Sequence, residues 1–278
     1  MQDFLSFFET MPFWQKLTWV AGLLTLFWIL ETGFAFAKAK NTPHSNRSKW
    51  QHAGTNLVFL VMISLINIGF GRLLLWVDQL TDTQHWGLFS MYKAPMWLDL
   101  VVALVLLDLI SQYLAHVMLH KFPWFWRLHI VHHSDTHVDA TTGTRQHPIE
   151  FAMRESLSLL TILFTGMPIA FYLFYRILTI FFTYWTHADI RLPKRLDRAL
   201  SYIIVTPAMH KFHHHHEMPW TDTNFGNVLS IWDRMFGTFV YENADDVVYG
   251  VDIIDNDRNN DVLYQLKAPW NRHIKWKK

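Results

Sequence analysis

The chain has 278 residues, of which 51% are hydrophobic, 16% aromatic and only 17% charged, below the roughly 25% charged residues of an ordinary soluble domain. The net charge of +1 gives no reason to expect a nucleic acid as a partner. Because there is no cysteine, disulfides, iron–sulfur clusters, thiolate-ligated haem and thiolate zinc sites are excluded. This composition indicates a membrane protein with a substantial polar part.

Three apolar stretches, at about 14–37, 55–77 and 95–115, are each close to the ~20 residues that a helix needs to cross a bilayer. The loop between the second and third is mainly acidic, whereas the loop between the first and second is basic. Positive loops stay in the cytoplasm, so residue 116 and those after it are expected on the cytoplasmic side. The basic residues of the first loop are Lys38, Lys40, Arg47 and Lys49.

A fourth apolar stretch, 157–185, is interrupted near its middle by Gly166-Met167-Pro168, where a helix should break. Basic residues flank the stretch on both sides, so both of its ends are expected to be cytoplasmic. We therefore predict two short helices in a hairpin that enters and leaves the membrane on the same face. The alternative is a single kinked span, which would place the last histidines on the opposite side from the earlier ones.

The predicted fold is an all-α integral membrane protein. About three spans and a re-entrant helical hairpin form the bundle, and a histidine-rich helical cap and a short C-terminal tail lie in the cytoplasm. Short strands are expected in the tail at 237–241 and 247–251. No internal repeat, low-complexity segment or linker divides the chain, so a single domain over 1–278 is expected.

The histidines are grouped at helical spacing. His116 and His120 are four residues apart, and the motifs HIVHH (129–133) and HKFHH (210–214) both place histidines at offsets 0, 3 and 4. Residues three and four apart share one face of a helix, so each group can aim two or three imidazoles at one point. Imidazole binds iron, zinc, copper and nickel. Eight such nitrogens are too many for one ion and about right for two, so the sequence predicts a metal site.

Asp108, Gln112, His116 and His120 lie within one arc of the third span. A polar stripe on an apolar helix should face the interior of the bundle. Asp108 either supports a ligand histidine through its N–H group or only packs helices together, and both roles stay open.

His187, at the end of the hairpin, and His147, in RQHPIE, are expected to complete the metal shell. Glu150 is expected to orient His147 or to cap the helix that follows. Asn227 and Asp233 are expected to brace the last histidine cluster as structural support. The remaining histidines, His52 among them, are assigned no role, except for three with a solvated or supporting role: His137, His215 and His216.

The motifs HVMLH (116–120), HIVHH (129–133) and HKFHH (210–214) resemble those of the fatty acid hydroxylase / sterol desaturase superfamily, in the same order and spacing. TTGTRQHPIE (141–150) and TNFGNVLSIWDRMFGTF (223–239) add to the resemblance. The match covers roughly residues 95–250 and is strongest with the bacterial branch, which is similar to alkylglycerol monooxygenase.

The resemblance implies a non-haem diiron centre that uses O2 and electrons to hydroxylate or desaturate a lipid of the fatty acyl, sterol or alkylglycerol type. Zinc can replace iron in such imidazole sites on purification. The bacterial inner membrane is the expected location, with the active site on the cytoplasmic face. The extra histidines at 215–216 depart from the family's pattern. Carried over by position, the ligands are His116, His120, His129, His132, His133, His147, His187, His210, His213 and His214.

The sequence has no dinucleotide-binding fingerprint, so an external electron donor such as a ferredoxin, a cytochrome or a reduced pterin is expected. A transition-metal transporter or storage protein is the alternative function. It is disfavoured because transport needs polar groups along a path through the membrane. A zinc hydrolase is disfavoured because HVMLH lacks the glutamate of HExxH.

Overall fold

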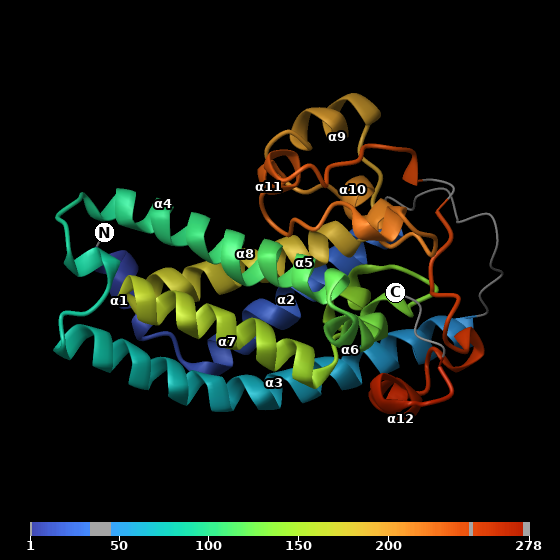
Figure 1. Ribbon diagram of the computed structural model, residues 1–278, viewed down its shortest axis with the longest axis horizontal. Coiled ribbons are helices and arrows are strands. Elements are labelled where there is room, and N and C mark those ends of the chain that lie inside the picture. Colours follow the sequence, from blue (N-terminus) through green and yellow to red (C-terminus); the bar gives the residue numbers. More distant parts are fainter. Residues whose placement is uncertain (1, 34–45, 245–246, 275–278) are drawn as a thin grey trace.

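The computed structural model describes residues 2–33, 46–244 and 247–274. Long helices run along the long axis of the molecule, and the histidine-bearing segments gather at one end (Figure 1). The α-helices are α1 Gln2–Glu9, α2 Phe13–Gly33, α3 Asn46–Thr83, α4 Met96–Leu107, α5 Ala115–Lys121, α6 Pro123–His133, α7 Pro148–Thr165, α8 Ile169–His187, α9 Lys194–Leu200, α10 Pro207–His213, α11 Ile231–Met235 and α12 Val262–Lys267.

Four segments are long and apolar enough to cross a membrane: Phe13–Glu31, Lys49–Ser90, Met96–Lys121 and Ile169–His187. Large apolar side chains stay exposed on these segments, for example Trp14 at 67% and Leu65 at 64%, as expected for helices that face lipid tails. The chain is therefore an all-α protein with the helices of an integral membrane protein. Residues 34–37, the end of the first predicted span, and Lys38 and Lys40 lie outside the described residues.

The fourth apolar stretch is two helices, α7 and α8, joined at Gly166–Pro168. Gly166 has a φ of +63°, which a glycine adopts without strain. The tip of the hairpin lies against Trp86 and Gly87, just after α3. With 18 and 19 residues, the helices are each about 27–28 Å long. The hairpin starts and ends at the histidine end of the bundle, as expected. Its helices are longer than the two short helices that the sequence predicted, and they run along the length of the bundle (Figure 1).

The third predicted span continues from α4 through a π-helical segment, Asp108–Leu114, into α5. The Asp108 carboxylate is buried and accepts hydrogen bonds from the Tyr175 hydroxyl (2.8 Å), the Trp232 indole (2.8 Å) and the Leu229 backbone N–H (3.1 Å). These partners belong to α8, to α11 and to the loop before α11. Asp108 therefore ties the bundle to the cap, and no histidine is among these partners.

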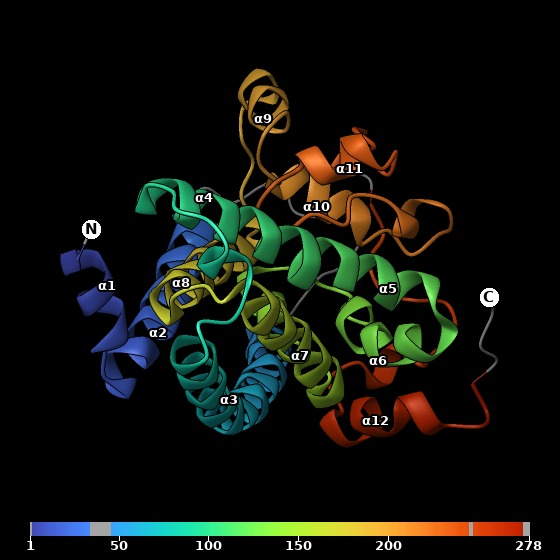
Figure 2. The same ribbon diagram turned by 60° about the vertical axis from the view of Figure 1, so that its left-hand side comes forward.

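The C-terminal segment is packed against the cap and is not a loose tail. Its residues Val251, Ile254 and Ala268 join Trp126 and Ile130 of α6 in one apolar cluster, and α12 lies beside α6 (Figure 2). The expected strands at 237–241 and 247–251 are absent from the described residues, where an isolated bridge joins positions 204 and 229. The backbone of each segment bonds to a loop instead. The Thr238 carbonyl accepts from the Asn224 backbone N–H, and the Val248 carbonyl accepts from the His216 backbone N–H.

Replacing Gly166 by alanine should lower the thermal unfolding midpoint. The left-handed backbone costs about 1–2 kcal/mol with a side chain, and the new Cβ would lie 2.1 Å from the Trp86 carbonyl oxygen. The matched control is Gly22→Ala in α2, where nothing lies within 4 Å of the added atom and alanine is the better helix former. Melting in detergent, followed by circular dichroism, checks this, and equal midpoints for the two variants would contradict it.

Candidate metal centre

Nine buried histidines form two adjoining groups at one end of the bundle. Within each group the facing ligand atoms all lie within 4.8 Å of one another. The groups touch, because the ring centroids of His133 and His214 are 4.6 Å apart. The first group contains His116, His120, His129, His133 and His213, and the second contains His132, His187, His210 and His214.

The repeated 0, 3, 4 spacing divides each histidine triad between the two groups. Helix α6 contributes His129 and His133 to the first group and His132 to the second. Helix α10 and the residue after it contribute His213 to the first group and His210 and His214 to the second. Residues three and four apart diverge slightly on a helix face, so one helix placed between two centres can serve both.

The inner nitrogens of the second group have the spacing of a closed metal shell. His187 Nε2 lies 3.1 Å from His132 Nε2, 3.0 Å from His210 Nε2 and 3.3 Å from His214 Nε2. Nitrogen ligands at 2.0–2.1 Å from one ion stand about 3 Å apart. In the first group, His116 Nε2 lies 3.0 Å from His129 Nε2, a similar separation.

The outer nitrogens of four rings donate hydrogen bonds to backbone carbonyls. A carbonyl can only accept, so it fixes the tautomer with the proton on Nδ1 and turns the Nε2 lone pair inward. Three of the acceptors lie in loops, and the fourth is in the last turn of α8. The donor–acceptor pairs are His116 with Phe225 (2.8 Å), His132 with Arg145 (3.2 Å), His187 with Thr183 (2.7 Å) and His213 with Thr223 (2.6 Å).

Two further rings are oriented by carboxylates. Glu150 accepts from His129 Nδ1 at 2.8 Å, and Asp222 accepts from His120 Nδ1 at 3.2 Å. Glu150 was expected to orient His147 or to cap α7, but its partner is a different histidine. Sequence reasoning missed Asp222, because no spacing links it to a histidine about a hundred residues earlier. A carboxylate behind an imidazole raises its basicity as a metal ligand.

Burial keeps five of the grouped imidazoles uncharged by lowering the pKa of each. It lowers the pKa of His132, His133, His210 and His214 well below the usual histidine value, with a further lowering from neighbouring histidines, and it lowers the pKa of His213 to about 3. The neutral ring is the form that binds metal.

Several inner nitrogens have no other use within the described chain. Both ring nitrogens of His133 and Nε2 of His213 are buried without a hydrogen-bond partner there. Each such atom costs about 1–3 kcal/mol when left unsatisfied, a cost that a bound cation would remove. The donor set of neutral nitrogens therefore fits a transition metal such as iron or zinc.

His147 is placed outside both groups, which corrects the expectation that it completes the shell. Its Nδ1 accepts from the Ile149 backbone N–H at 3.2 Å, its Nε2 contacts the Leu266 carbonyl at 3.4 Å, and its ring faces Trp270. It thus caps the start of α7 and holds the C-terminal segment. The half-buried rings of His215 and His216 stack on each other. Neither of them nor His137 belongs to either histidine group.

Asp233 acts on the centre indirectly. Its carboxylate accepts from the backbone N–H groups of Phe225 (2.7 Å) and Gly226 (2.9 Å), which fixes the loop whose carbonyl receives His116. Asn227 donates to Gln112 at 3.0 Å. The bracing expected of Asp233 therefore has a structural route, whereas Asn227 joins the polar stripe of the third span.

A buried network beside the second group was not foreseen. His52 contacts the Asp135 carboxylate at 2.8 Å and 2.9 Å, which joins α3 to the segment after α6. The fully buried Arg145 donates to the Val131 carbonyl (2.9 Å) and to the Asn259 carbonyl. Arg145 therefore links α6 to the C-terminal segment, and its own carbonyl receives His132.

The fatty acid hydroxylase family model matches residues 100–238, which include all nine grouped histidines. The chain belongs to this family. It is 30% identical over 162 residues to alkylglycerol monooxygenase of Caenorhabditis elegans, with 57% of this chain and 30% of that protein covered.

Two further relatives are similar. Ornithine lipid hydroxylase OlsE of Rhizobium tropici is 30% identical over 145 residues, with 52% of this chain and 43% of that protein covered. Alkylglycerol monooxygenase of Danio rerio is 34% identical over 142 residues, with 51% of this chain and 30% of that protein covered. The chain therefore matches less than half the length of each of these relatives. No solved structure matches it.

Metal content should separate His147 from the grouped histidines. His187→Gln should reduce bound metal, because its Nε2 lies within 3.3 Å of three other inner nitrogens. The control His147→Gln should retain the full content, because its ring contacts only the start of α7 and the C-terminal segment. Mass-spectrometric metal analysis of the purified variants measures this, and a loss of metal in His147→Gln would refute the assignment.

Proposed function

We propose that this protein is a membrane-bound lipid oxygenase that holds two iron ions, one in each histidine group, and oxidises a lipid C–H bond with O2. The observation that carries the proposal is the pair of adjoining groups of five and four buried, inward-facing histidines. Bound iron would supply the redox chemistry that no side chain offers. Hydroxylation inserts one oxygen atom into the C–H bond and releases the other as water, and it consumes two electrons and two protons.

The chain's own residues hold the metal shell and shield it. Nine imidazoles hold the ions, and backbone carbonyls and two carboxylates set the direction of six of them. Trp126 lies 4.9 Å from the His120 ring and Phe225 lies 5.5 Å from the His116 ring, between centroids. These rings cover one side of the first group and exclude water, which protects a strong oxidant from quenching.

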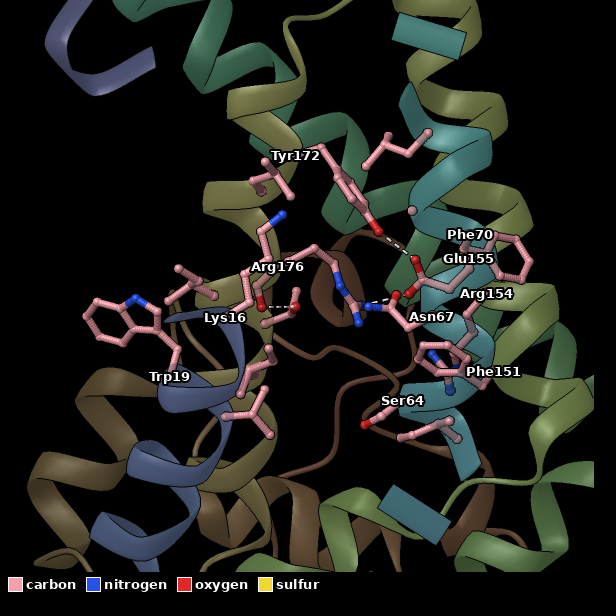
Figure 3. Close-up of a pocket in the computed structure, with 18 of the residues that line it drawn as sticks. Lys16, Trp19, Ser64, Asn67, Phe70, Phe151, Arg154, Glu155, Tyr172 and Arg176 are labelled. Carbon is pink, nitrogen blue, oxygen red and sulfur yellow. Dashed lines mark hydrogen bonds and ion pairs between the residues drawn. The ribbon is translucent and has the colours of Figure 1, made fainter. Parts of the chain in front are cut away.

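A cavity inside the bundle gives a lipid access to the centre. Its volume is about 460 Å³, and α2, α3, α7 and α8 line most of it (Figure 3), within the usual range for ligand sites. Thr183 and Gly143 line its inner end. Thr183 receives the His187 hydrogen bond, and a Cβ on Gly143 would lie 3.4 Å from His187 Nδ1. The lipid therefore approaches the second group from inside the bundle.

Electrons come from an external donor, such as a ferredoxin, a cytochrome or a reduced pterin, because the sequence contains no dinucleotide fingerprint. Hydroxylation and desaturation use the same centre and differ in the product. A metal transporter is disfavoured because the grouped histidines lie together at one end of the bundle (Figure 1), and transport needs polar sites along the crossing.

The proposal is tested by comparing the lipids of cells that express the protein, cells that lack it and cells that express His132→Ala. We expect a hydroxylated or newly unsaturated lipid only with the unaltered protein. The variant should accumulate normally but lose most of the product. His147→Gln serves as the matched control and should keep the product. Purified protein that binds metal but consumes no O2 with any membrane lipid extract and a chemical reductant would contradict the oxygenase function.

The histidine end is proposed to face the cytoplasm of the bacterial inner membrane. Helix α9, which begins with Lys194 and Arg195, lies toward that end, whereas the last turns of α3, with Asp78 and Asp82, lie at the other (Figure 1), in keeping with the retention of positive charge in the cytoplasm. The absence of native cysteine allows a direct test.

Met91→Cys, in the exposed loop after α3, should react with a membrane-impermeant maleimide in intact spheroplasts. Met235→Cys, exposed at the end of α11, should react only after lysis, because the cap would lie inside the cell. Both positions are more than 60% exposed, so reactivity reports sidedness. The reverse pattern would mean that the histidine end faces outward.

A further inference from the structure

One segment of the cap, residues 191–204, stands out from the side of the bundle. It contains α9 and the turn after it, and both views show α9 projecting beside the long helices (Figures 1 and 2). Helical backbone bonds continue past the end of α9, because the Ser201 N–H donates to the Asp197 carbonyl (2.8 Å) and the Ile204 N–H donates to the Leu200 carbonyl (3.0 Å). We call residues 191–204 the shoulder.

The outer side of the shoulder combines large apolar side chains with basic ones. Leu196 is 47% exposed and Ile203 is 64% exposed, and residues seven apart share one face of a helix. Apolar and cationic side chains that are exposed together are typical of segments that lie in a membrane interface. The exposed basic residues of the shoulder are Arg191, Lys194, Arg195 and Arg198.

Most acidic side chains near the shoulder are already engaged. Asp197, the one acidic residue of the shoulder, is buried, and its carboxylate accepts a hydrogen bond from the Tyr241 hydroxyl at 2.7 Å. Asp189, just before the shoulder, pairs with Lys211. Glu242, which follows Tyr241, is exposed.

Helix α11 adds a fifth cation to this surface. The Arg234 guanidinium carbon lies 4.4 Å from the centroid of the Tyr202 ring, and the guanidinium donates to the Ser201 carbonyl at 3.3 Å. Five exposed cations therefore stand against the exposed carboxylate of Glu242 in this part of the described chain. This balance favours an anionic partner.

The shoulder stands at the level of a membrane surface. Helix α11, which holds the shoulder through Arg234, is joined to the third span by the bond from Trp232 to Asp108 (2.8 Å). Asp108 comes twelve residues after Met96, where α4 begins at the far end of the bundle (Figure 1). Twelve helical residues measure about 18 Å, less than the ~30 Å of a hydrocarbon core. Lipid around the bundle therefore reaches this joint, and the shoulder beside it meets the lipid headgroups.

Helix α12 is an exposed part of the cap that stands beyond this level. The Asn260 carbonyl, just before α12, accepts from the Thr55 hydroxyl at 2.9 Å. Thr55 comes 28 residues before Thr83, where α3 ends at the far end of the bundle, which corresponds to about 42 Å of helix. Leu263 of α12 is 59% exposed, so it provides a matched position outside the membrane.

We propose that the shoulder docks on the surface of the membrane that holds the bundle, and that it recognises anionic phospholipid headgroups. Leu196 and Ile203 enter the boundary between headgroups and acyl chains, and the five cations bind phosphate groups. A second copy of the chain fits less well, because a symmetric contact would bring the same cations together. Docking requires no turnover, so the proposal does not rest on the oxygenase function.

A depth measurement tests the docking. Because the chain has no cysteine, Ile203→Cys and Leu263→Cys each accept one environment-sensitive fluorophore. The labelled full-length proteins are placed in nanodiscs whose lipids have a nitroxide on the upper acyl chain. The label at position 203 should be strongly quenched, because its side chain enters the lipid boundary. The label at position 263 should be quenched no more than the free fluorophore.

The charge preference is measured with two nitroxide lipids, a phosphatidylglycerol and a phosphatidylcholine, added in equal trace amounts to zwitterionic nanodiscs. Quenching at position 203 should favour phosphatidylglycerol about fivefold, since one basic residue near an anionic surface contributes roughly that factor. Adding Lys194→Gln, Arg195→Gln and Arg198→Gln should bring the ratio close to one. The control Lys267→Gln with Arg272→Gln removes exposed charge elsewhere on the described cap and should leave the ratio unchanged.

Equally weak quenching at positions 203 and 263 would place the shoulder in water and overturn the docking. Equal quenching by the two lipids would overturn the recognition of anionic headgroups. A label at position 203 that is shielded only in nanodiscs with two copies would assign the surface to a second copy instead. Circular dichroism establishes that each variant is folded, and where the triple variant is not, the lipid comparison on Ile203→Cys alone decides the question.

Discussion

The structure depends on the burial of nine imidazoles at one end of a membrane bundle. Each buried ring has two nitrogens, and both need a partner. Loops after α6 and α10 and the first turn of α7 provide acceptors for outer nitrogens, and the inner nitrogens face one another across distances that suit a shared cation. The irregular backbone of the cap supplies carbonyl groups that accept hydrogen bonds from the rings. In a regular helix, those carbonyls would bond to backbone N–H groups of the same helix.

The α7–α8 hairpin connects this centre to the membrane. It begins beside Glu150, which orients His129, and it returns to end at His187. Asp108 ties the hairpin to the third span and to α11 through Tyr175 and Trp232. The same helices enclose the cavity. A single kinked span would deliver His187 to the far side of the membrane, so the break at Gly166 is a condition for the site as well as a feature of the fold.

Most of the candidate site was visible in the sequence because its signal is local. Spacing of three and four residues places imidazoles on one helix face whatever the rest of the chain does, and all nine grouped histidines were among the ten singled out. The tenth, His147, has no such partner in sequence, and its position next to a helix start suits a cap equally well. The extended hairpin, the missing strands at 237–241 and 247–251 and the packed C-terminal segment depend on distant contacts that local patterns do not record.

The sequence by itself determined the helical membrane class, the break in the fourth apolar stretch and the groups of histidines, because hydrophobic length and helical period are properties of neighbouring residues. Only the tertiary structure decided which histidines share a centre and which acceptor stands behind each ring. It also decided that Arg176 and Glu155 meet inside the bundle. Some of those pairings join residues more than a hundred positions apart, and they are set by how the helices pack, which no short stretch of the chain encodes.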